Sequence, residues 1–285
     1  MGYAATTSIT NTITSDAQFR AWGSAYAAKW ASMGLLQIVD AAQINWATVA
    51  TPGAINTVKG YEIWYFADAL QATVPVYVKI EYGSGSGAAD GALWLSFGTG
   101  DNGAGALTGV VSTRVQVKCT ASAGNITHIW SGDTNRALVA VMGAAATTSM
   151  NISFERTVDI NGAVTSEGIL FIYRSGSTWA QTIWNQQTGQ AAVAETQLGC
   201  SGSGQAPYGV GGLQIAVYPI MINKGVFCYY PLGMFMYENA TIAAGSTITF
   251  TVYGAAHTYY TEGSTAGGSP GKVGFSTGAV MLRYE

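Results

Sequence analysis

Charged side chains are scarce in this chain. Only 9% of its 285 residues are Asp, Glu, Lys or Arg, against about 25% in an average soluble domain. Hydrophobic residues make up 48%, and Gly contributes 37 residues. A folded chain of this composition has few charges on its surface. Such a surface is tolerable when partner subunits cover much of it, or when Ser, Thr, Asn and Gln supply its polarity. The composition therefore points first to a protein that assembles.

Clusters of basic residues and long apolar runs are also missing. The net charge is −3, and no run of Lys or Arg offers a footprint for a phosphate backbone. No segment has the 18 or more apolar residues of a membrane-spanning helix. The first residues lack the basic start and apolar centre of a secretion signal. We therefore expect no nucleic-acid partner, no membrane insertion and no signal peptide.

Cysteine and histidine are rare, which limits the available chemistry. Cys119, Cys200 and Cys228 are far apart, with no Cys-x-x-Cys pair and no nearby His, so neither a zinc site nor a disulfide framework is indicated. His128 and His257 are the two histidines. Both are flanked by aromatic residues at strand-like spacing, so we expect structural histidines in both cases.

Oxygen ligands for a hard cation have no recognisable pattern either. Asp90, Asp101, Asn102 and Asp133 lie in loop-like sequence but lack the spacing of a calcium loop. The string at Gly98 reads G-x-G-x-x-G, yet neither a helix nor an acidic residue about 20 positions on follows, as a dinucleotide site would need. We predict an inter-strand loop there, and no metal or cofactor.

Catalytic patterns fail on their chemistry. Ser269 and Ser276 both stand in G-x-S-x-G strings, but Pro270 lacks the N–H that a serine-hydrolase oxyanion hole takes from the residue after the nucleophile. After Ser276 the chain has too few residues for a downstream acid and His. Glu155 and Glu167 belong to the densest acidic group and keep a glycan hydrolase as a remote alternative. The prediction is that the protein is not an enzyme.

One amphipathic helix is indicated near the N-terminus. Ser15 and Gln18 form a capping box, and Gly34 supplies a left-handed exit. The pattern predicts a helix from about Asp16 to Met33, with five large side chains on one stripe. These are Phe19, Trp22, Tyr26, Trp30 and Met33. The stripe either packs on the chain's own sheet or contacts a neighbouring subunit, and the five residues are our interface candidates.

Beyond Leu35 the sequence favours strands. Segments rich in Val, Ile, Thr and aromatics, from QINWATV to VGFSTGAVMLRY, alternate with short Gly, Ser, Asn and Asp clusters. Many closely spaced strands predict an all-β fold, a β-sandwich or jelly roll with one N-terminal amphipathic helix. We divide the chain into an arm and helix, 1–34, and a sandwich body, 35–285, with a soft boundary at 199–212.

Aromatic residues keep a second function open. Eight Trp and sixteen Tyr could supply platforms for stacking on sugars. The candidates for glycan contacts are Trp179, Tyr208 and Tyr259. The alternative function is therefore a carbohydrate-binding or host-recognition module.

Four long stretches resemble virion structural proteins of tailed bacteriophages. They are FRAWGSAYAAKWASMGLLQIVDAAQINWATV (19–49), GYEIWYFADALQATVPVYVKIEYGSG (60–85), FERTVDINGAVTSEGIL (154–170) and IAAGSTITFTVYGAAHTYY (242–260). The resemblance implies a non-enzymatic particle component of the tail, baseplate or head surface. Its partners would be further copies of itself, in a symmetric homo-oligomer, and other virion proteins. It would be made in the host cytoplasm and reside in the virion.

Overall fold

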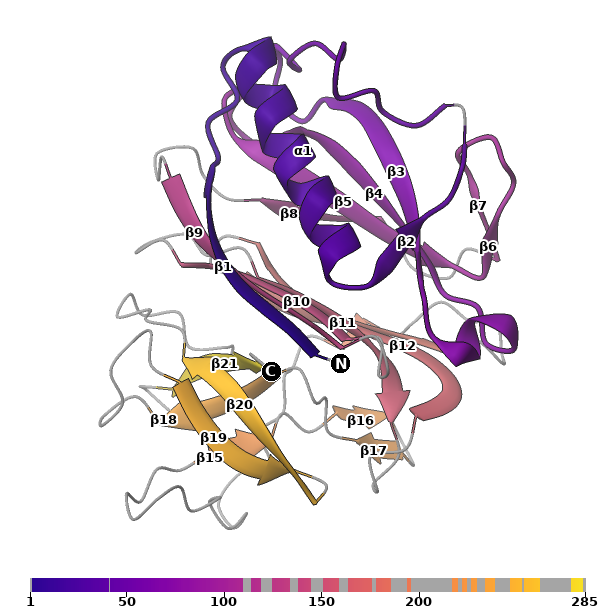
Figure 1. Ribbon diagram of the computed structural model, residues 1–285, viewed down its shortest axis with the longest axis vertical. Helices are drawn as coiled ribbons and strands as arrows, with labels where there is room; N and C mark the ends of the chain where they lie inside the picture. The colour runs from indigo at the N-terminus through magenta and orange to yellow at the C-terminus, as the bar shows by residue number, and fades with distance from the viewer. Residues whose placement is uncertain are drawn as a thin grey trace.

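Antiparallel β-sheets and a single α-helix make up the described fold in the computed structural model (Figure 1). The described residues are 2–40, 42–109, 114–118, 125–133, 138–144, 151–158, 164–175, 178–185, 194–195, 217–219, 222–224, 227–229, 234–238, 247–252, 254–261 and 278–283. Every paired strand in these ranges runs antiparallel to its neighbour. The predicted all-β class is confirmed at this level.

The first sheet has five strands and carries the helix α1 (Asp16–Ser32) on one face (Figure 1). Its order is β2 (Leu35–Gln37), β3 (Val58–Phe66), β4 (Tyr77–Ser84), β5 (Gly91–Gly98) and β8 (Val115–Lys118). The 3-10 helix η1 (Ala69–Ala72) connects β3 to β4. A small hairpin of β6 (Gly100–Asp101) and β7 (Leu107–Thr108) follows β5.

The second sheet has seven strands and lies in the middle of the molecule in Figure 1. Its order is β1 (Gly2–Thr10), β9 (Asn125–Asp133), β10 (Leu138–Ala144), β11 (Asn151–Val158), β12 (Val164–Ser175), β13 (Thr178–Asn185) and β14 (Ala194–Glu195). Neighbours from β9 onward are consecutive in the chain. β1 is the exception, because it pairs with β9 along its whole length.

The third sheet contains C-terminal strands and lies on the other side of the seven-stranded sheet in Figure 1. Its order is β15 (Val217–Pro219), β18 (Met234–Glu238), β21 (Gly278–Arg283), β20 (Ala255–Thr261) and β19 (Thr247–Val252). A separate pair is formed by β16 (Ile222–Lys224) and β17 (Phe227–Tyr229). The soft boundary at 199–212 lies outside the described residues.

The helix begins and ends where its caps predict. The Ser15 hydroxyl accepts a hydrogen bond from the Gln18 backbone N–H at 3.3 Å, and the Gln18 side chain accepts one from the Thr14 N–H at 3.0 Å. In a standard capping box the Gln18 side chain would accept the N–H of the N-cap residue Ser15, whereas here it accepts the N–H of Thr14, the residue before the cap. Gly34 has φ 94° after the helix, a conformation that favours glycine. The predicted helix and both of its end signals are confirmed.

The core lies between the inner face of the first sheet, α1 and the facing side of the seven-stranded sheet. Alternate residues of β3, β4 and β5 belong to this core, as the period of a strand requires. The middle sheet contributes Ile152, Phe154, Ile169 and Phe171. Trp30 and Phe154 meet with ring centroids 6.2 Å apart. The helix is thus part of the joint between two sheets.

The helix stripe is not a subunit interface in this structure, which corrects that reading. All five candidates are at most 2% exposed. They are Phe19, Trp22, Tyr26, Trp30 and Met33. The stripe meets the chain's own sheets, because an aromatic face of this size finds enough apolar surface within the same chain.

Two local assignments differ from the prediction, and a third is refined. QINWATV at 43–49 is irregular and turn-like rather than a strand. The N-terminal residues are not a separate arm, since β1 joins the middle sheet and Ile13 N–H donates to Ala89 O at 3.0 Å beside β5. The loop after Gly98 is a short β6–β7 hairpin with no helix at its glycines, so the rejection of a dinucleotide turn agrees with the structure.

Candidate functional site

Of the three proposed glycan contacts, Tyr259 is placed unfavourably. It lies in β20, is 0% exposed, and stacks on Phe250 with ring centroids 4.6 Å apart. Its burial corrects the expectation of a loop aromatic, because a ring with no accessible face cannot stack on a sugar. Trp179 lies in β13, and Tyr208 lies outside the described residues.

The acidic candidates lie in separate parts of the fold, apart from Glu155 and Glu167, which are on the paired strands β11 and β12. Glu155 is 3% exposed in β11, and Glu167 lies in β12. The Asp90 and Asp101 carboxylates accept the N–H groups of Gly87 and Gly103 in local turns. Within the described ranges, no three His, Cys, Asp or Glu side chains gather where they could hold a metal ion.

A buried carboxylate that sequence reasoning missed lies between α1 and the first sheet. Glu62 in β3 is 2% exposed. It accepts hydrogen bonds from Trp46 Nε1 at 2.9 Å, Trp64 Nε1 at 3.2 Å and Tyr82 Oη at 2.5 Å. The sequence carried one sign of this site: Glu62 shares a strand face with the apolar residues Trp64 and Phe66. A lone Glu on the inward face of a strand needs hydrogen-bond partners.

Burial dominates the electrostatics of this Glu62 cluster. Desolvation raises the pKa of Glu62 above its ordinary value, although the hydrogen bonds from Tyr82, Trp46 and Trp64 oppose the rise. Burial, and then the Glu62 charge, raises the pKa of Tyr82 well above its ordinary range. Trp46 crosses from the irregular 43–49 segment to contact both Phe19 and Tyr82. The cluster therefore pins that segment between helix and sheet, and is closed to a substrate.

The outer face of the first sheet presents a row of partly exposed apolar side chains. Leu36, Tyr65 and Tyr77 are cross-strand neighbours on β2, β3 and β4. The two tyrosine rings are 5.7 Å apart at an interplanar angle of 36°, and Leu36 is 48% exposed. The row ends at Gly98, where a Cβ would come 3.0 Å from the Leu107 side chain of β7. The β6–β7 hairpin thus walls one end of an aromatic platform.

Charged groups beside this platform are engaged within the chain. Lys79 donates to the Gly105 carbonyl at 2.6 Å and lies 4.3 Å from the centroid of the Tyr61 ring. Arg114 pairs with Glu81 and covers the Trp94 ring at 4.9 Å. These contacts leave the Tyr65 and Tyr77 end with a neutral character suited to uncharged ligands.

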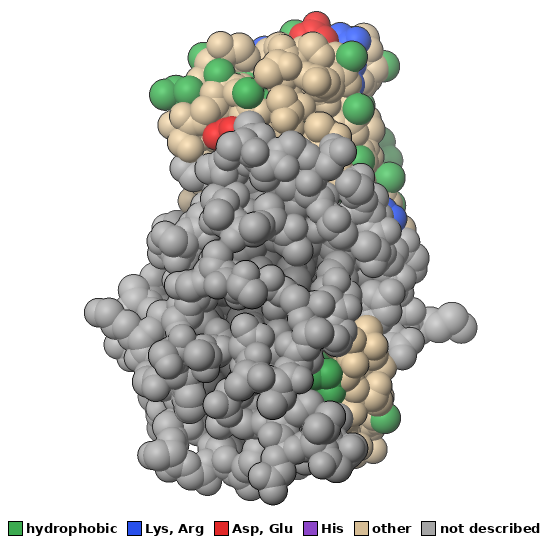
Figure 2. Space-filling model, turned by 90° about the vertical axis from the view of Figure 1, so that its left-hand side faces the viewer, with side chains coloured by type: hydrophobic (Ala, Val, Ile, Leu, Met, Phe, Trp, Pro, Cys, Tyr) green, Lys and Arg blue, Asp and Glu red, His purple; other side chains and the backbone are tan. Residues whose placement is uncertain are grey.

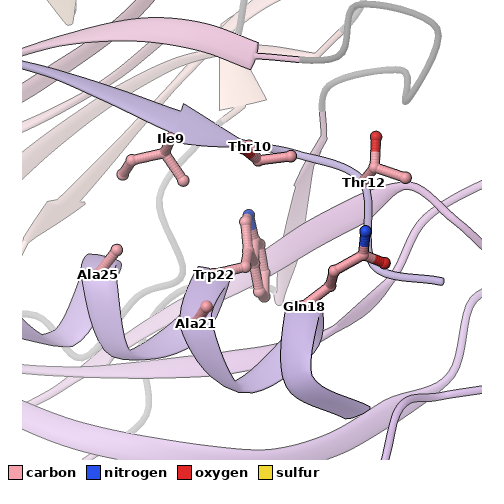
Figure 3. Close-up of a pocket in the computed structure, with 7 residues that line it drawn as sticks. All are labelled: Ile9, Thr10, Thr12, Gln18, Ala21, Trp22 and Ala25. Carbon is pink, nitrogen blue, oxygen red and sulfur yellow. The ribbon is translucent and has the colours of Figure 1, made fainter. Parts of the chain in front are cut away.

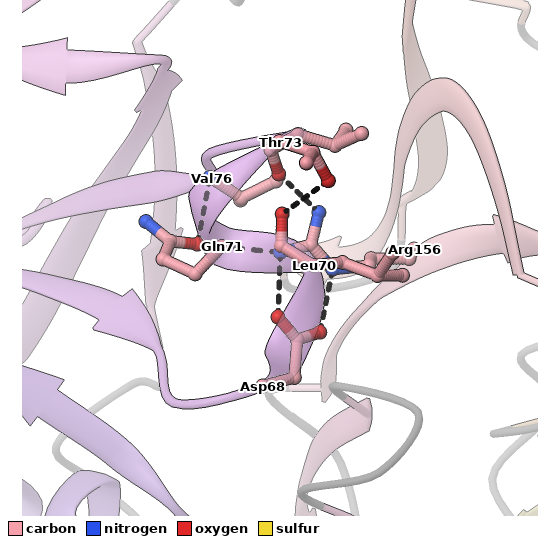
Figure 4. A network of polar contacts seen from close by, with 7 residues as sticks. Asp68, Leu70, Gln71, Thr73, Val76 and Arg156 are labelled. Carbon is pink, nitrogen blue, oxygen red and sulfur yellow. Dashed lines mark hydrogen bonds and ion pairs between the residues drawn. The ribbon is translucent and has the colours of Figure 1, made fainter.

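A second buried ionic group joins the first sheet to the seven-stranded sheet (Figure 4). Arg156 of β11 has a side chain 0% exposed and binds Asp68 through Nε at 2.7 Å and Nη2 at 2.9 Å. It also donates to Val74 O at 2.6 Å and to Gln71 Oε1 at 3.2 Å. One guanidinium thereby fixes the β3–β4 connection against the middle sheet.

A pocket of about 350 Å³ opens between the end of β1 and α1 (Figure 3). Its lining side chains are all uncharged. They are Ile9, Thr10, Thr12, Gln18, Ala21, Trp22 and Ala25. Trp22 is held in place by its Nε1 donating to Asn11 Oδ1 at 3.1 Å. The alanines leave space because they present only a Cβ.

No protein-family model matches the chain, and no curated protein is significantly similar to it. In the described part of the chain, no helix combines the length and apolar character needed to cross a bilayer.

Proposed function

We propose that this protein is a non-enzymatic structural component of a tailed-bacteriophage virion, in the tail, the baseplate or the head surface. In this proposal the sheets form a β-sandwich or jelly-roll-like body that assembles as a symmetric homo-oligomer and contacts other virion proteins. The sequence resemblance and the 9% content of charged residues support it. Figure 2 agrees with the composition, since charged side chains are sparse among the coloured residues.

The observation that carries the proposal is a sheet edge with no second strand beside it among the described residues. β19 is the last strand of the third sheet, and among the described strands it pairs only with β20. Its sequence, TITFTV, has neither a charge nor a proline. Ile248 and Phe250 are buried, while Thr247, Thr249 and Thr251 are exposed. Proteins that must stay monomeric usually protect such edges with Lys, Pro or a bulge, whereas a bare edge can pair with another chain.

The test is the mass in solution, by light scattering over a concentration series. The chain mass is 29.6 kDa, and a fixed multiple of it is expected. Thr249→Lys should weaken association by at least about tenfold, because a charge at the edge opposes pairing. Thr258→Lys is the matched control, since Thr258 lies opposite Thr249 on the interior strand β20. A monomer at every concentration would contradict self-assembly.

Location in a particle needs its own experiment. Antibodies against the purified protein should label intact tailed-phage particles at symmetric positions in electron micrographs. Particles purified from a lysate of cells that express this chain, but free of both protein and label, would contradict the virion assignment.

A carbohydrate-binding module is the second candidate, favoured by the neutral platform at Tyr65 and Tyr77. Sugar rings stack their C–H faces on aromatic rings of this kind. A glycan array should then give a neutral-sugar binder that Tyr65→Leu or Tyr77→Leu removes. Tyr61→Phe is the control, since Tyr61 is covered by Lys79 and donates to Asp40. An array without a specific binder would remove this candidate.

A further inference from the structure

We propose that Asn102, in the β6–β7 hairpin, is a site of self-modification at which the Gly103 backbone nitrogen attacks the Asn102 side-chain amide. The attack releases ammonia and closes a succinimide ring, which water then opens to aspartate or isoaspartate. This chemistry is internal to one hairpin, so it does not depend on the proposed assembly.

The attacking nitrogen is accessible and lies beside a carboxylate. Gly103 is exposed, and a Cβ built on it would meet nothing within 4 Å apart from its chain neighbours, so no side chain hinders the approach. Its backbone N–H donates to Asp101 Oδ1 at 2.7 Å. This carboxylate is therefore placed to take the N–H proton as a general base when the new bond forms.

The amide under attack is held by two further backbone N–H groups. Asn102 Oδ1 accepts hydrogen bonds from the N–H of Ala104 at 2.9 Å and from the N–H of Ala106 at 3.0 Å. The oxygen becomes negatively charged when the nitrogen adds to Cγ. Two donors already aimed at this oxygen stabilise that charge, as in an oxyanion hole. The hairpin thus polarises the group that must react.

Further contacts fix this arrangement. The Asn102 backbone N–H donates to Ala106 O at 3.0 Å. Gly105 is buried, and its carbonyl accepts a hydrogen bond from Lys79 Nζ at 2.6 Å. A loop held in this way presents the base, the nucleophile and the amide together, which lowers the entropic cost of the reaction.

Every atom of the reaction comes from the hairpin and from water. The bond from Gly103 N to Asn102 Cγ forms as the N–H proton moves to Asp101. The tetrahedral oxyanion then collapses and the Cγ–Nδ2 bond breaks. The leaving nitrogen takes the proton from Asp101 and departs as ammonia, which restores the carboxylate. Hydrolysis at either ring carbonyl gives aspartate or isoaspartate at position 102.

The product changes both the charge and the backbone of the hairpin. Either form adds a negative charge beside Asp101, in a chain whose net charge is −3. Isoaspartate also lengthens the main chain by a carbon, which displaces the hydrogen bonds between residue 102 and Ala106. The hairpin that walls the Tyr65 and Tyr77 platform is therefore altered as the protein ages.

Peptide mapping of the stored full-length protein by mass spectrometry tests the site. Isoaspartate at position 102 is the expected product at neutral pH, because direct hydrolysis of the side chain by water gives only aspartate. Asp101→Asn keeps an acceptor for the Gly103 N–H but removes the base, and should slow the conversion of Asn102 at least about tenfold in the folded protein. Circular dichroism checks that this variant is folded.

Two controls separate this chemistry from the ordinary lability of Asn-Gly pairs. In urea, where the hairpin is unfolded, the wild type and Asp101→Asn should convert at nearly equal rates. Asn161-Gly162 is a second such pair in the sequence, outside the described residues, and its rate should be the same in both proteins. The proposal is overturned if Asn102 stays intact in the folded protein after the unfolded chain has converted, or if both folded proteins convert equally fast.

Discussion

At the residue scale, Glu62 should make stability depend on pH. Burial raises its folded-state pKa above the ordinary value of 4.5. As the pH rises from that value, the unfolded chain releases the proton before the folded chain does. The contribution of this group to stability is therefore full below about pH 4.5 and is lost as the pH rises through the folded pKa, with a slope of up to about 1.4 kcal/mol per pH unit.

Two substitutions at this cluster test the sign of this pH dependence. Glu62→Gln should remove this part of the pH slope in urea unfolding, and should cost about 1–3 kcal/mol because one indole N–H loses its acceptor. Tyr82→Phe should extend the slope to higher pH, since the Tyr82 hydrogen bond is the largest influence lowering the Glu62 pKa. Identical pH profiles for the wild type and Glu62→Gln would contradict this account.

Arg156 shows how one buried charge sets the relation between two sheets. Arg156→Met leaves the Asp68 carboxylate, only 5% exposed, without its ion-pair partner. The expected loss of unfolding free energy is about 3–5 kcal/mol. The double variant Asp68→Asn with Arg156→Met should lose less than Arg156→Met alone, because no uncompensated charge is left. Additive losses in chemical denaturation would mean that the two side chains are not coupled.

At the element scale, α1 contains a glycine whose role depends on tertiary structure. Gly→Ala inside a helix normally stabilises by about 1 kcal/mol. At Gly23, however, a Cβ would lie 1.9 Å from Trp46 Cη2. Gly23→Ala should instead destabilise by about 1–3 kcal/mol, since the indole must move away from Glu62. Ser24→Ala, at an exposed neighbour, should be neutral or slightly stabilising in thermal melts. If Gly23→Ala and Ser24→Ala both stabilised the protein, the Trp46 ring could not lie against Gly23.

The same elements show what the sequence could predict. Ser15, Gln18 and Gly34 act through neighbouring backbone groups, so the helix and its ends were predictable. The surface against which the helix stripe packs was not predictable, because the periodicity of apolar residues defines one face of the helix but not what that face contacts. The segment 43–49 alternates like a strand, yet Trp46 leaves the pattern to reach Glu62. The Glu62 cluster joins three separate segments, and no local spacing encodes that meeting.

The strand Gly2–Thr10 was missed for a related reason. Its small residues give little hydrophobic alternation, and its partner, β9, lies more than a hundred residues further along the chain. Pairing at such separation depends on the assembled sheet and not on local propensity. The long β11–β12 hairpin segments, by contrast, are rich in Ile and Phe and were predicted as strands.

At the scale of the whole molecule, the N-terminal segment of residues 2–33 links the sheets. β1 closes one edge of the seven-stranded sheet, residues 11–13 run beside β5, and α1 fills the space between two layers. The five buried side chains of the helix stripe contribute roughly 10 kcal/mol by burial. That contribution is as large as the whole stability of a typical domain, about 5–15 kcal/mol. The core therefore depends on the N-terminal segment.

Removing residues 1–33 should consequently abolish the fold rather than trim an arm. The deletion exposes the inner face of the first sheet around Trp64 and Tyr82 and leaves an edge of β9 unpaired. We expect no cooperative thermal transition, strong binding of a hydrophobic dye and aggregation in light scattering. Deletion of residues 2–8 alone keeps Ile9 and the helix, so it should retain a cooperative transition at lower temperature. A deletion of 1–33 that melts like the full chain would mean that the body folds independently, because only then could the sheets pack without the helix between them.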